Sequence, residues 1–334
     1  MSSGLRQILS ELLEGSGLEW GLAPLTDADA AERRQRLERW TEAGFHGTME
    51  WIPKSLAVRA DPRVEWPWAR SALVVRRGHG LDPAPDLRGE RPVVACYARG
   101  RDYHRVLEDY LRDLADRLKK RVPGLCTLAC VDVMPIPEVD LAVRAGLGFR
   151  GRHTLLISRT AGSAANLGVL LLSEDCEPAA TIPDLCGTCT ACLSACPTGA
   201  LTSAGLNANL CLSHWNIEDR STTEGPAARA VRGEVLGCDL CQQACPWNRR
   251  HLREVPQPEG WPETWEGWIA AFAPGAGSGP LTKKTPLERV GRAKLRRVLL
   301  RALENVDPAR AAAARERARS EETHPALLRW LEKR

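Results

Sequence analysis

The sequence predicts an α+β fold, with a mixed α/β part first, a cysteine-rich part next and a helical part at the C-terminus. Over the first 175 residues, helix-like and strand-like segments mix without a regular βαβ repeat. Two closely spaced runs of cysteines occupy residues 186–246. Residues 283–301 and 310–334 then carry apolar or Ala/Arg/Glu-rich patterns at helical spacing. We therefore expect domains at 1–175, 176–255 and 256–334.

The composition indicates an ordinary globular protein of about two domains. Of the 334 residues, 43% are hydrophobic and 26% are charged, and the net charge is only +4. An anionic partner must therefore meet a local patch of cations rather than the whole surface. The first residues carry no apolar segment of signal-peptide length, and no run approaches 18 consecutive apolar residues. We expect a cytoplasmic protein without a membrane span, in which the cysteines bind metal rather than form disulfides.

The two cysteine runs have the spacing of iron–sulfur proteins. The first reads C-x2-C-x2-C-x3-C-P, the second reads C-x2-C-x3-C-P, and Cys211 lies between them. In bacterial proteins with two [4Fe–4S] clusters, the last cysteine of each run ligates the other cluster. Two structural zinc sites are the alternative, but the paired C-x3-C-P endings argue against zinc. The pattern predicts a ferredoxin-like domain with one cluster on Cys186, Cys189, Cys192 and Cys245 and another on Cys196, Cys211, Cys238 and Cys241.

The remaining elements follow from periodicity and turn residues. Helices are expected at 1–20, 27–43 and 101–122, the last with one apolar stripe. Strands are expected at 71–76, 93–97, 127–133, 155–157 and 167–172. A G-x-G-x-x-G pattern at 146–151 leads into a strand-like run rather than a helix, so we do not expect a dinucleotide site. Cys126, Cys130 and Cys176 have no partner spacing and are interpreted as incidental thiols.

A cationic segment precedes the C-terminal helix. Between residues 283 and 301, eight lysines and arginines stand against Glu288 alone, and leucines and valines supply an apolar face. Such a run is either a solvated helix face or a surface that meets phosphates. The sequence pattern alone leaves both interpretations open.

Several segments together resemble the epoxyqueuosine reductase family, over about residues 40 to 305. The resemblance implies a cobalamin-binding domain, a double-cluster domain and a helical C-terminal part. It implies reduction of the epoxide of epoxyqueuosine in tRNA, with an external low-potential electron donor, by a monomer. The matching segments are Phe45-His46-Gly47-Thr48-Met49, Arg59-x-Asp61-Pro62-Arg63, Cys96 to His104, Val131-Asp132, Ala145 to Gly151, Cys186 to Pro197, Cys211 to Glu218 and Gly237 to Asn248.

The resemblance also suggests roles for single residues. Asp132 matches the family's proton donor, and Glu138 and Asp140 are nearby alternatives. A carboxylic acid can donate near neutral pH only if burial raises its pKa. The D-x-H-x-x-G pattern of mutase-type cobalamin proteins is incomplete at residues 102–107, so no histidine is expected on cobalt from that motif. The expected cobalamin contacts are Arg59, Cys96, Asp132, His153 and Thr154, and the expected tRNA contacts are Lys283, Lys284, Arg292, Lys294 and Arg297.

Two other functions share some of these features. A cobalamin-dependent reductive dehalogenase also uses two clusters, but the sequence start has no twin-arginine signal and the basic C-terminal segment would be unexplained. A ferredoxin-like electron carrier, or a nucleic-acid-binding protein with structural clusters, is the third possibility. About 180 residues precede the cysteines, far more than a carrier needs.

Overall fold

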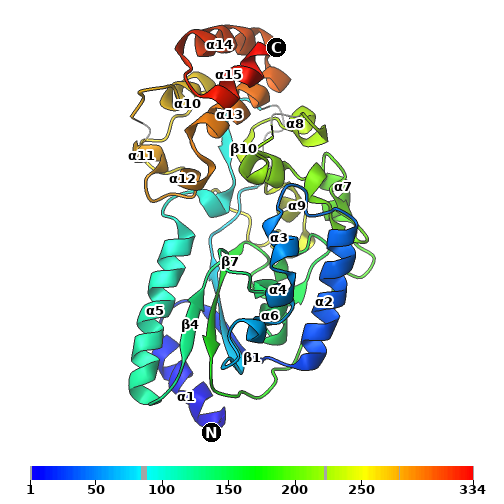
Figure 1. The fold of residues 1–334 in the computed structure, drawn as a ribbon, viewed down its shortest axis with the longest axis vertical. Coiled ribbons are helices and arrows are strands. Elements are labelled where there is room, and N and C mark those ends of the chain that lie inside the picture. The colour runs from blue at the N-terminus through cyan, green and yellow to red at the C-terminus, as the bar shows by residue number, and fades with distance from the viewer. Residues whose placement is uncertain (1, 84–88, 222–223, 278, 334) are drawn as a thin grey trace.

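The computed structural model describes residues 2–83, 89–221, 224–277 and 279–333. Its central element is a four-stranded antiparallel sheet in the order β1-β2-β7-β4 (Figure 1). Along β2, Leu73 and Val75 enter one apolar core while Ala72 and Val74 enter the other. Both faces of the sheet are therefore buried, which explains the continuous apolar run in the sequence. The strands are β1 (Glu19–Pro24), β2 (Ser71–Gly78), β4 (Thr127–Cys130) and β7 (Ala165–Leu172).

Helices cover both faces of this sheet (Figure 1). On one face, α1 (Ser2–Leu13) packs on α5 (Tyr103–Arg121), which begins at the N-cap Asp102. On the other face lies α6 (Glu138–Arg144), near α2 (Asp27–Glu42), α3 (Trp51–Lys54) and α4 (Leu56–Ala60). The helix expected over residues 1–20 ends at Leu13, because Gly15 and Gly17 both take a φ of 70° and turn the chain into β1.

The cysteine-rich segment consists of short elements and is joined to the N-terminal segment by backbone pairing. Strand β10 (Glu234–Leu236) runs parallel to β3 (Val93–Val94). Gly47 takes a φ of 61°, and a Cβ there would lie 2.7 Å from the His214 ring, so glycine allows this close approach. The other elements here are α7 (Ala191–Ala195), β8 (Leu201–Thr202), β9 (Gly205–Leu206), η3 (Ala208–Leu210), the π-helix η4 (His214–Glu218), α8 (Pro226–Ala230), α9 (Leu240–Gln243) and η5 (Pro246–Asn248).

The C-terminal segment is helical, and it lies at the opposite end of the molecule from the N-terminus (Figure 1). Its core is built around Trp265, Trp268 and Leu299, each no more than 1% exposed. Val94 and Ala98 join the same core, so this segment packs directly on the first part of the chain. The helices are α10 (Trp265–Ala271), α11 (Gly279–Thr282), α12 (Leu287–Val290), α13 (Arg292–Val306), α14 (Pro308–Glu321) and α15 (Pro325–Glu332).

Four short elements complete the first part of the chain. The glycine pattern at 146–151 contains β5 and leads into β6, the strand-like run that the sequence predicted at 155–157, rather than opening a helix. In the described part of the chain, no helix combines the length and the apolar character needed to cross a membrane. The remaining elements are η1 (Pro62–Val64), η2 (Cys96–Ala98), β5 (Phe149–Arg150) and β6 (Leu156–Ile157).

Candidate active site

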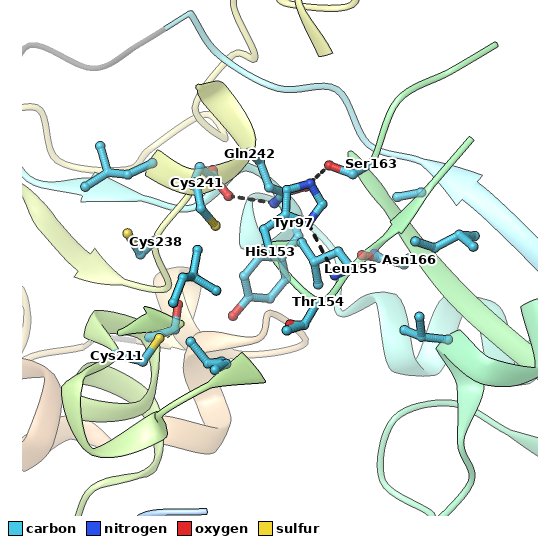
Figure 2. Close-up of a pocket in the computed structure, with 18 of the residues that line it drawn as sticks. Tyr97, His153, Thr154, Leu155, Ser163, Asn166, Cys211, Cys238, Cys241 and Gln242 are labelled. Carbon is cyan, nitrogen blue, oxygen red and sulfur yellow. Dashed lines mark hydrogen bonds between the residues drawn. The ribbon is translucent and has the colours of Figure 1, made fainter. Parts of the chain in front are cut away.

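A cavity of about 440 Å³ lies between the central sheet and the cysteine-rich segment. Figure 2 shows Cys211, Cys238 and Cys241 along one side of this cavity and Asn166 on the other. Tyr97 and His153 lie between these two sides. Segments more than 100 residues apart in the sequence therefore contribute to one site. The cavity is also lined by Tyr103, Asp132, Glu138, Thr154, Leu155, Ser163 and Cys196.

The eight candidate cluster thiols lie close enough together to influence one another's pKa. In the first predicted ligand set, burial and then the Cys186 and Cys192 thiols raise the pKa of the Cys245 thiol, and Cys189 acts on Cys192. In the second, burial and then Cys211 raise the pKa of Cys241, and Cys196 acts on both, while Cys192 of the first set also acts on Cys241. Thiols that perturb each other in this way lie close together. Each thiol loses its proton when it binds a metal ion. The Cys241 and Cys211 charges also act on Cys238, and the predicted division into two ligand sets stays a prediction.

The end of the second cysteine run is tied to the turn before β7. Asn248 Oδ1 accepts the Ser163 N–H at 2.7 Å, and Asn248 Nδ2 donates to Ser163 Oγ at 2.9 Å. Ser163 Oγ in turn donates to Gln242 Oε1 at 2.9 Å. These bonds account for the Gln and Asn of the Gln-x-x-Cys-Pro-Trp-Asn motif. They fix the cysteine loop to the cavity wall, and Ser163 carried no signal in the sequence.

Asp132 lies at the end of β4 in a left-handed backbone conformation, with a φ of 55°. Its N–H donates to Glu138 Oε1 at 2.6 Å. Its Oδ2 lies 2.9 Å from His104 Nε2, and His104 Nδ1 lies 2.5 Å from Asp102 Oδ1. The Tyr103 hydroxyl donates to the same Oδ2 at 3.3 Å. A buried imidazole thus bridges two carboxylates, and this bridge leads from the protein interior to the cavity.

The two cavity carboxyls have opposite pKa shifts. Burial acts to raise the pKa of Asp132, but the hydrogen bond and charge of His104 outweigh it, so this pKa lies below its ordinary value. The condition for proton donation near neutral pH is therefore not met by the chain alone, in which the Asp132 side chain is 56% exposed and faces the cavity. Burial, reinforced by the Asp132 charge, raises the pKa of Glu138 to about 8. Glu138 is thus neutral at pH 7.

This shift makes folding stability depend on pH. The pKa of Glu138 is about 8 in the folded chain against 4.5 for a free glutamate, so the folded state holds the extra proton between these values. Stability therefore falls as pH rises through this window. We expect Glu138→Gln to gain stability relative to the parent protein from pH 5 to 8, with no further change above about 8. Urea unfolding across this pH range measures the difference, and Glu65→Gln, at an exposed position, should show none.

The residues predicted to contact cobalamin lie in different surroundings. His153 is 3% exposed, and its Nδ1 accepts the Leu155 N–H, which leaves the proton on Nε2. Among the described residues this Nε2 has no hydrogen-bond partner. Burial lowers the pKa of His153 to about 4, so the ring is a neutral donor in the cavity wall. Thr154 lines both this cavity and a second one of about 670 Å³, which Arg59 also lines.

Cys96 is placed differently from the expectation. It packs in a small apolar cluster with Leu81 and Ala164, and its N–H donates to Asp239 Oδ2 at 2.7 Å. Burial raises the pKa of this thiol to about 12. Cys96 therefore helps to fix the cysteine loop through Asp239, and it lies outside the residues that line the cavity.

The residues present fit the cofactor that the resemblance implies. The two cavities, of about 440 and 670 Å³, share Thr154 and Leu206 and so lie next to each other, which suits a macrocycle with long substituents. The unpartnered His153 Nε2 supplies a donor for a polar edge of such a group. The eight thiols of the two cysteine runs and Cys211 are enough ligands for two iron–sulfur clusters, and Cys196, Cys211, Cys238 and Cys241 line the first cavity.

The cationic segment is only partly exposed. Lys283 and Lys284 are exposed, and the Lys284 carbonyl accepts the Asp102 N–H at 2.7 Å. Lys294 and Arg297 are buried, and Arg292 forms an ion pair with Glu322. The segment is thus not a uniform solvated face, because several of its cations fold inward onto carbonyls and acids. Arg296, for example, is 1% exposed and pairs with Glu321 and Glu322.

Cysteine runs with double-cluster spacing beside a cavity that holds two carboxyls are typical of iron–sulfur enzymes. Residues 185–248 match the family described as "4Fe-4S double cluster binding domain". Residues 59–133 match the one described as "Epoxyqueuosine reductase QueG, DUF1730". The chain belongs to the epoxyqueuosine reductase family.

Individual relatives support this assignment. The epoxyqueuosine reductase of Synechococcus sp. is 36% identical over 265 residues, which are 77% of this chain and 81% of that protein. That of Burkholderia pseudomallei is also 36% identical, over 70% of this chain but only 65% of its own length. A solved structure of selenomethionine-labelled epoxyqueuosine reductase aligns with a TM-score of 0.81 at 25% identity, covering 98% of this chain and 89% of its own. The mixed α/β fold is thus that of the family.

Proposed function

We propose that this protein reduces the epoxide of epoxyqueuosine in tRNA to the alkene of queuosine. One observation carries the proposal: a single cavity brings four of the predicted cluster thiols to the same space as the Asp132–His104 pair. A solved epoxyqueuosine reductase bound to an epoxyqueuosine-modified tRNA-Tyr stem loop shares the fold, with a TM-score of 0.77. The RNA substrate is inferred from that relative.

The reaction has a simple balance. An epoxide, two electrons and two protons give an alkene and water, so two C–O bonds break and the oxygen leaves fully protonated. When bound, two [4Fe–4S] clusters would pass single electrons from an external low-potential donor, and a cobalamin would supply the reducing power at carbon. The remaining requirement, two protons at the departing oxygen, falls to residues of this chain.

Asp132 is the residue that we assign to proton donation. Its carboxyl opens into the cavity and touches His104 Nε2, so a proton delivered to the substrate can be replaced through the imidazole. Asp102 holds the other ring nitrogen and stabilises the imidazole when it is charged. A substrate that fills the cavity displaces water from Asp132, which moves its pKa upward toward the range a donor needs.

Glu138 is placed to hold the second proton. It is neutral at pH 7 and sits against the Asp132 backbone, while the charge of Arg59 limits how far its pKa rises. The two carboxyls thus divide the task. Asp132 exchanges its proton with His104, and the neighbouring Glu138 carboxyl holds the second proton.

The direct test is an assay on the purified protein with reconstituted clusters, cobalamin and a chemical reductant. We expect conversion of epoxyqueuosine tRNA to queuosine tRNA, measured by mass spectrometry of the digested nucleosides. Omission of cobalamin should abolish conversion. Turnover of a halogenated aromatic compound in place of the RNA would overturn the proposal and favour a dehalogenase. We further propose that the protein acts as a monomer in the cytoplasm.

A further inference from the structure

The first cysteines of the chain lie on an outer loop, residues 185–190, at the surface of the cysteine-rich segment. Leu185 is 38% exposed, and Gly187 is exposed as well. In the second cysteine run, by contrast, Gly237 and Asp239 are buried. Among the described residues that line the first cavity, the cysteines are Cys196, Cys211, Cys238 and Cys241. The outer loop therefore lies outside that cavity and meets solvent.

The end of the second run packs against this outer loop. Cys245 and Cys186 lie in one small apolar cluster. Phe149 and Trp247 belong to the same cluster, and their ring centroids are 5.5 Å apart. The turn before β7 lies here too, because a Cβ on Gly162 would be 3.2 Å from the Trp247 carbonyl oxygen. Three segments that are distant in the sequence thus meet at one surface, namely 149–163, 185–190 and 245–250.

These three segments carry positive charge and no carboxylate. They contain no Asp or Glu, and their arginines are Arg150, Arg152, Arg159, Arg249 and Arg250. Arg150 forms an ion pair with Asp140 at 3.0 Å, and Arg152 holds the outer loop by donating to the Gly187 carbonyl at 2.7 Å. The other three arginines are exposed, and no acid pairs with them among the described residues.

Two acids border this surface, and both have partners. Asp184 precedes the outer loop, and its Oδ1 accepts the Cys186 N–H at 2.8 Å. Glu19 accepts a hydrogen bond from Thr160 Oγ1 at 3.5 Å and pairs with the buried Arg76. The surface thus keeps an excess of positive charge beside the exposed Leu185.

The position of this surface suits the entry of electrons. One predicted ligand set lines the catalytic cavity, whereas three thiols of the other set follow one another along and just after the outer loop. Proteins that exchange single electrons meet through small, short-lived interfaces. Complementary charge raises the rate at which such partners associate. An apolar centre with a cationic rim therefore fits a carrier of opposite charge.

We propose that the surface formed by Leu185, Arg159, Arg249 and Arg250 docks a small one-electron carrier protein of net negative charge. This inference rests on the proposed function, since it takes the electrons to come from outside the chain. In each encounter the reduced carrier gives up one electron, which the cluster held by the outer loop would accept. Two encounters supply the pair of electrons that one epoxide needs.

The test replaces two exposed arginines, as Arg249→Gln with Arg250→Gln, in the cluster-loaded protein. The probe is a reduced plant-type [2Fe–2S] ferredoxin of net negative charge. We expect the second-order rate constant for cluster reduction, followed by stopped-flow absorbance without RNA, to fall about tenfold at low salt. An unchanged rate constant would overturn the proposal. Arg152 is left in place, because it also lines the second cavity.

A matched control removes the same amount of charge elsewhere. Lys119 and Lys120 are exposed at the end of α5, where Arg121 contacts Glu11 of α1. Lys119→Gln with Lys120→Gln should leave the ferredoxin rate constant unchanged. An equal fall in this control would show that only the net charge of the protein matters, and it would contradict a docking surface at the outer loop.

Two further measurements separate docking from other losses. A small viologen radical needs no docking surface, so its rate of cluster reduction should be nearly unchanged in the arginine variant. Equal losses with the viologen and with ferredoxin would indicate a damaged cluster and contradict the proposal. The affinity for an unmodified anticodon stem-loop RNA should also be unchanged. A fall in RNA affinity with unchanged ferredoxin kinetics would assign these arginines to RNA instead.

The docking surface and the proposed reaction can fail separately. The ferredoxin measurements contain no RNA, so a protein that is reduced through this surface without converting epoxyqueuosine would refute only the reaction. Conversion of epoxyqueuosine with a chemical reductant, together with unchanged ferredoxin kinetics in the arginine variant, would refute only the docking surface.

Discussion

Replacing Asp132 with asparagine is expected to lower turnover of epoxyqueuosine RNA by about 10²–10⁴-fold, the usual contribution of a general acid. The amide keeps the size of the carboxyl and tolerates the φ of 55° at this position, so the fold should be retained. It can still contact His104 and Tyr103, but it cannot deliver a proton to the departing oxygen. Single-turnover assays with pre-reduced protein measure the chemical step apart from RNA binding.

The loss should appear in kcat and not in RNA affinity, because Asp132 is assigned to the transition state rather than to substrate binding. Asp113→Asn, at an exposed position of α5, provides a matched control with the same change in charge and should retain full turnover. A variant at Asp132 with turnover within a factor of three of the parent would move the donor role to Glu138. In that case Glu138→Gln should show the large loss instead.

Local patterns in the sequence predicted most of the fold. The stripe on residues 101–122 became α5, and the apolar runs at 71–76 and 167–172 became the paired strands β2 and β7. The edge strand β1 was missed, because the pairs of Glu19–Pro24 with β2 depend on a partner about 50 residues away. The helical periodicity of the first residues predicted a helix as far as residue 20, but two glycines end α1 earlier. Long-range pairing of this kind is not encoded in a local period.

The part of the site that depends on the spacing of cysteines could be predicted from the sequence. The cysteine runs predicted the ligand sets, because a cluster needs thiols at short fixed intervals. The Asp102–His104–Asp132 bridge was not predictable, since it depends on α5 bringing His104 against the end of β4. The direction of the Asp132 pKa shift was not predictable for the same reason. Burial was visible in principle, but the imidazole that opposes it is 28 residues away in sequence.

The cluster assignment leads to the second large effect. We expect Cys241→Ala to reduce the iron content from about eight to about four atoms per chain and to abolish turnover. Cys241 belongs to the thiol group that lines the cavity, so its cluster is the one beside the catalytic space. Loss of that cluster breaks electron delivery whatever the state of the other. Iron analysis and the anaerobic visible spectrum measure the loss.

Two further substitutions test the crossed pairing of the two groups. Cys245 ends the second run but is influenced by thiols of the first, Cys186 and Cys192. Cys245→Ala and Cys241→Ala should therefore remove different clusters, although the two residues lie four positions apart. Cys130→Ala is the control, because this thiol is buried in the sheet core and belongs to neither group. If Cys245→Ala and Cys241→Ala left identical residual spectra, each run would hold its own cluster and the crossed assignment would be wrong.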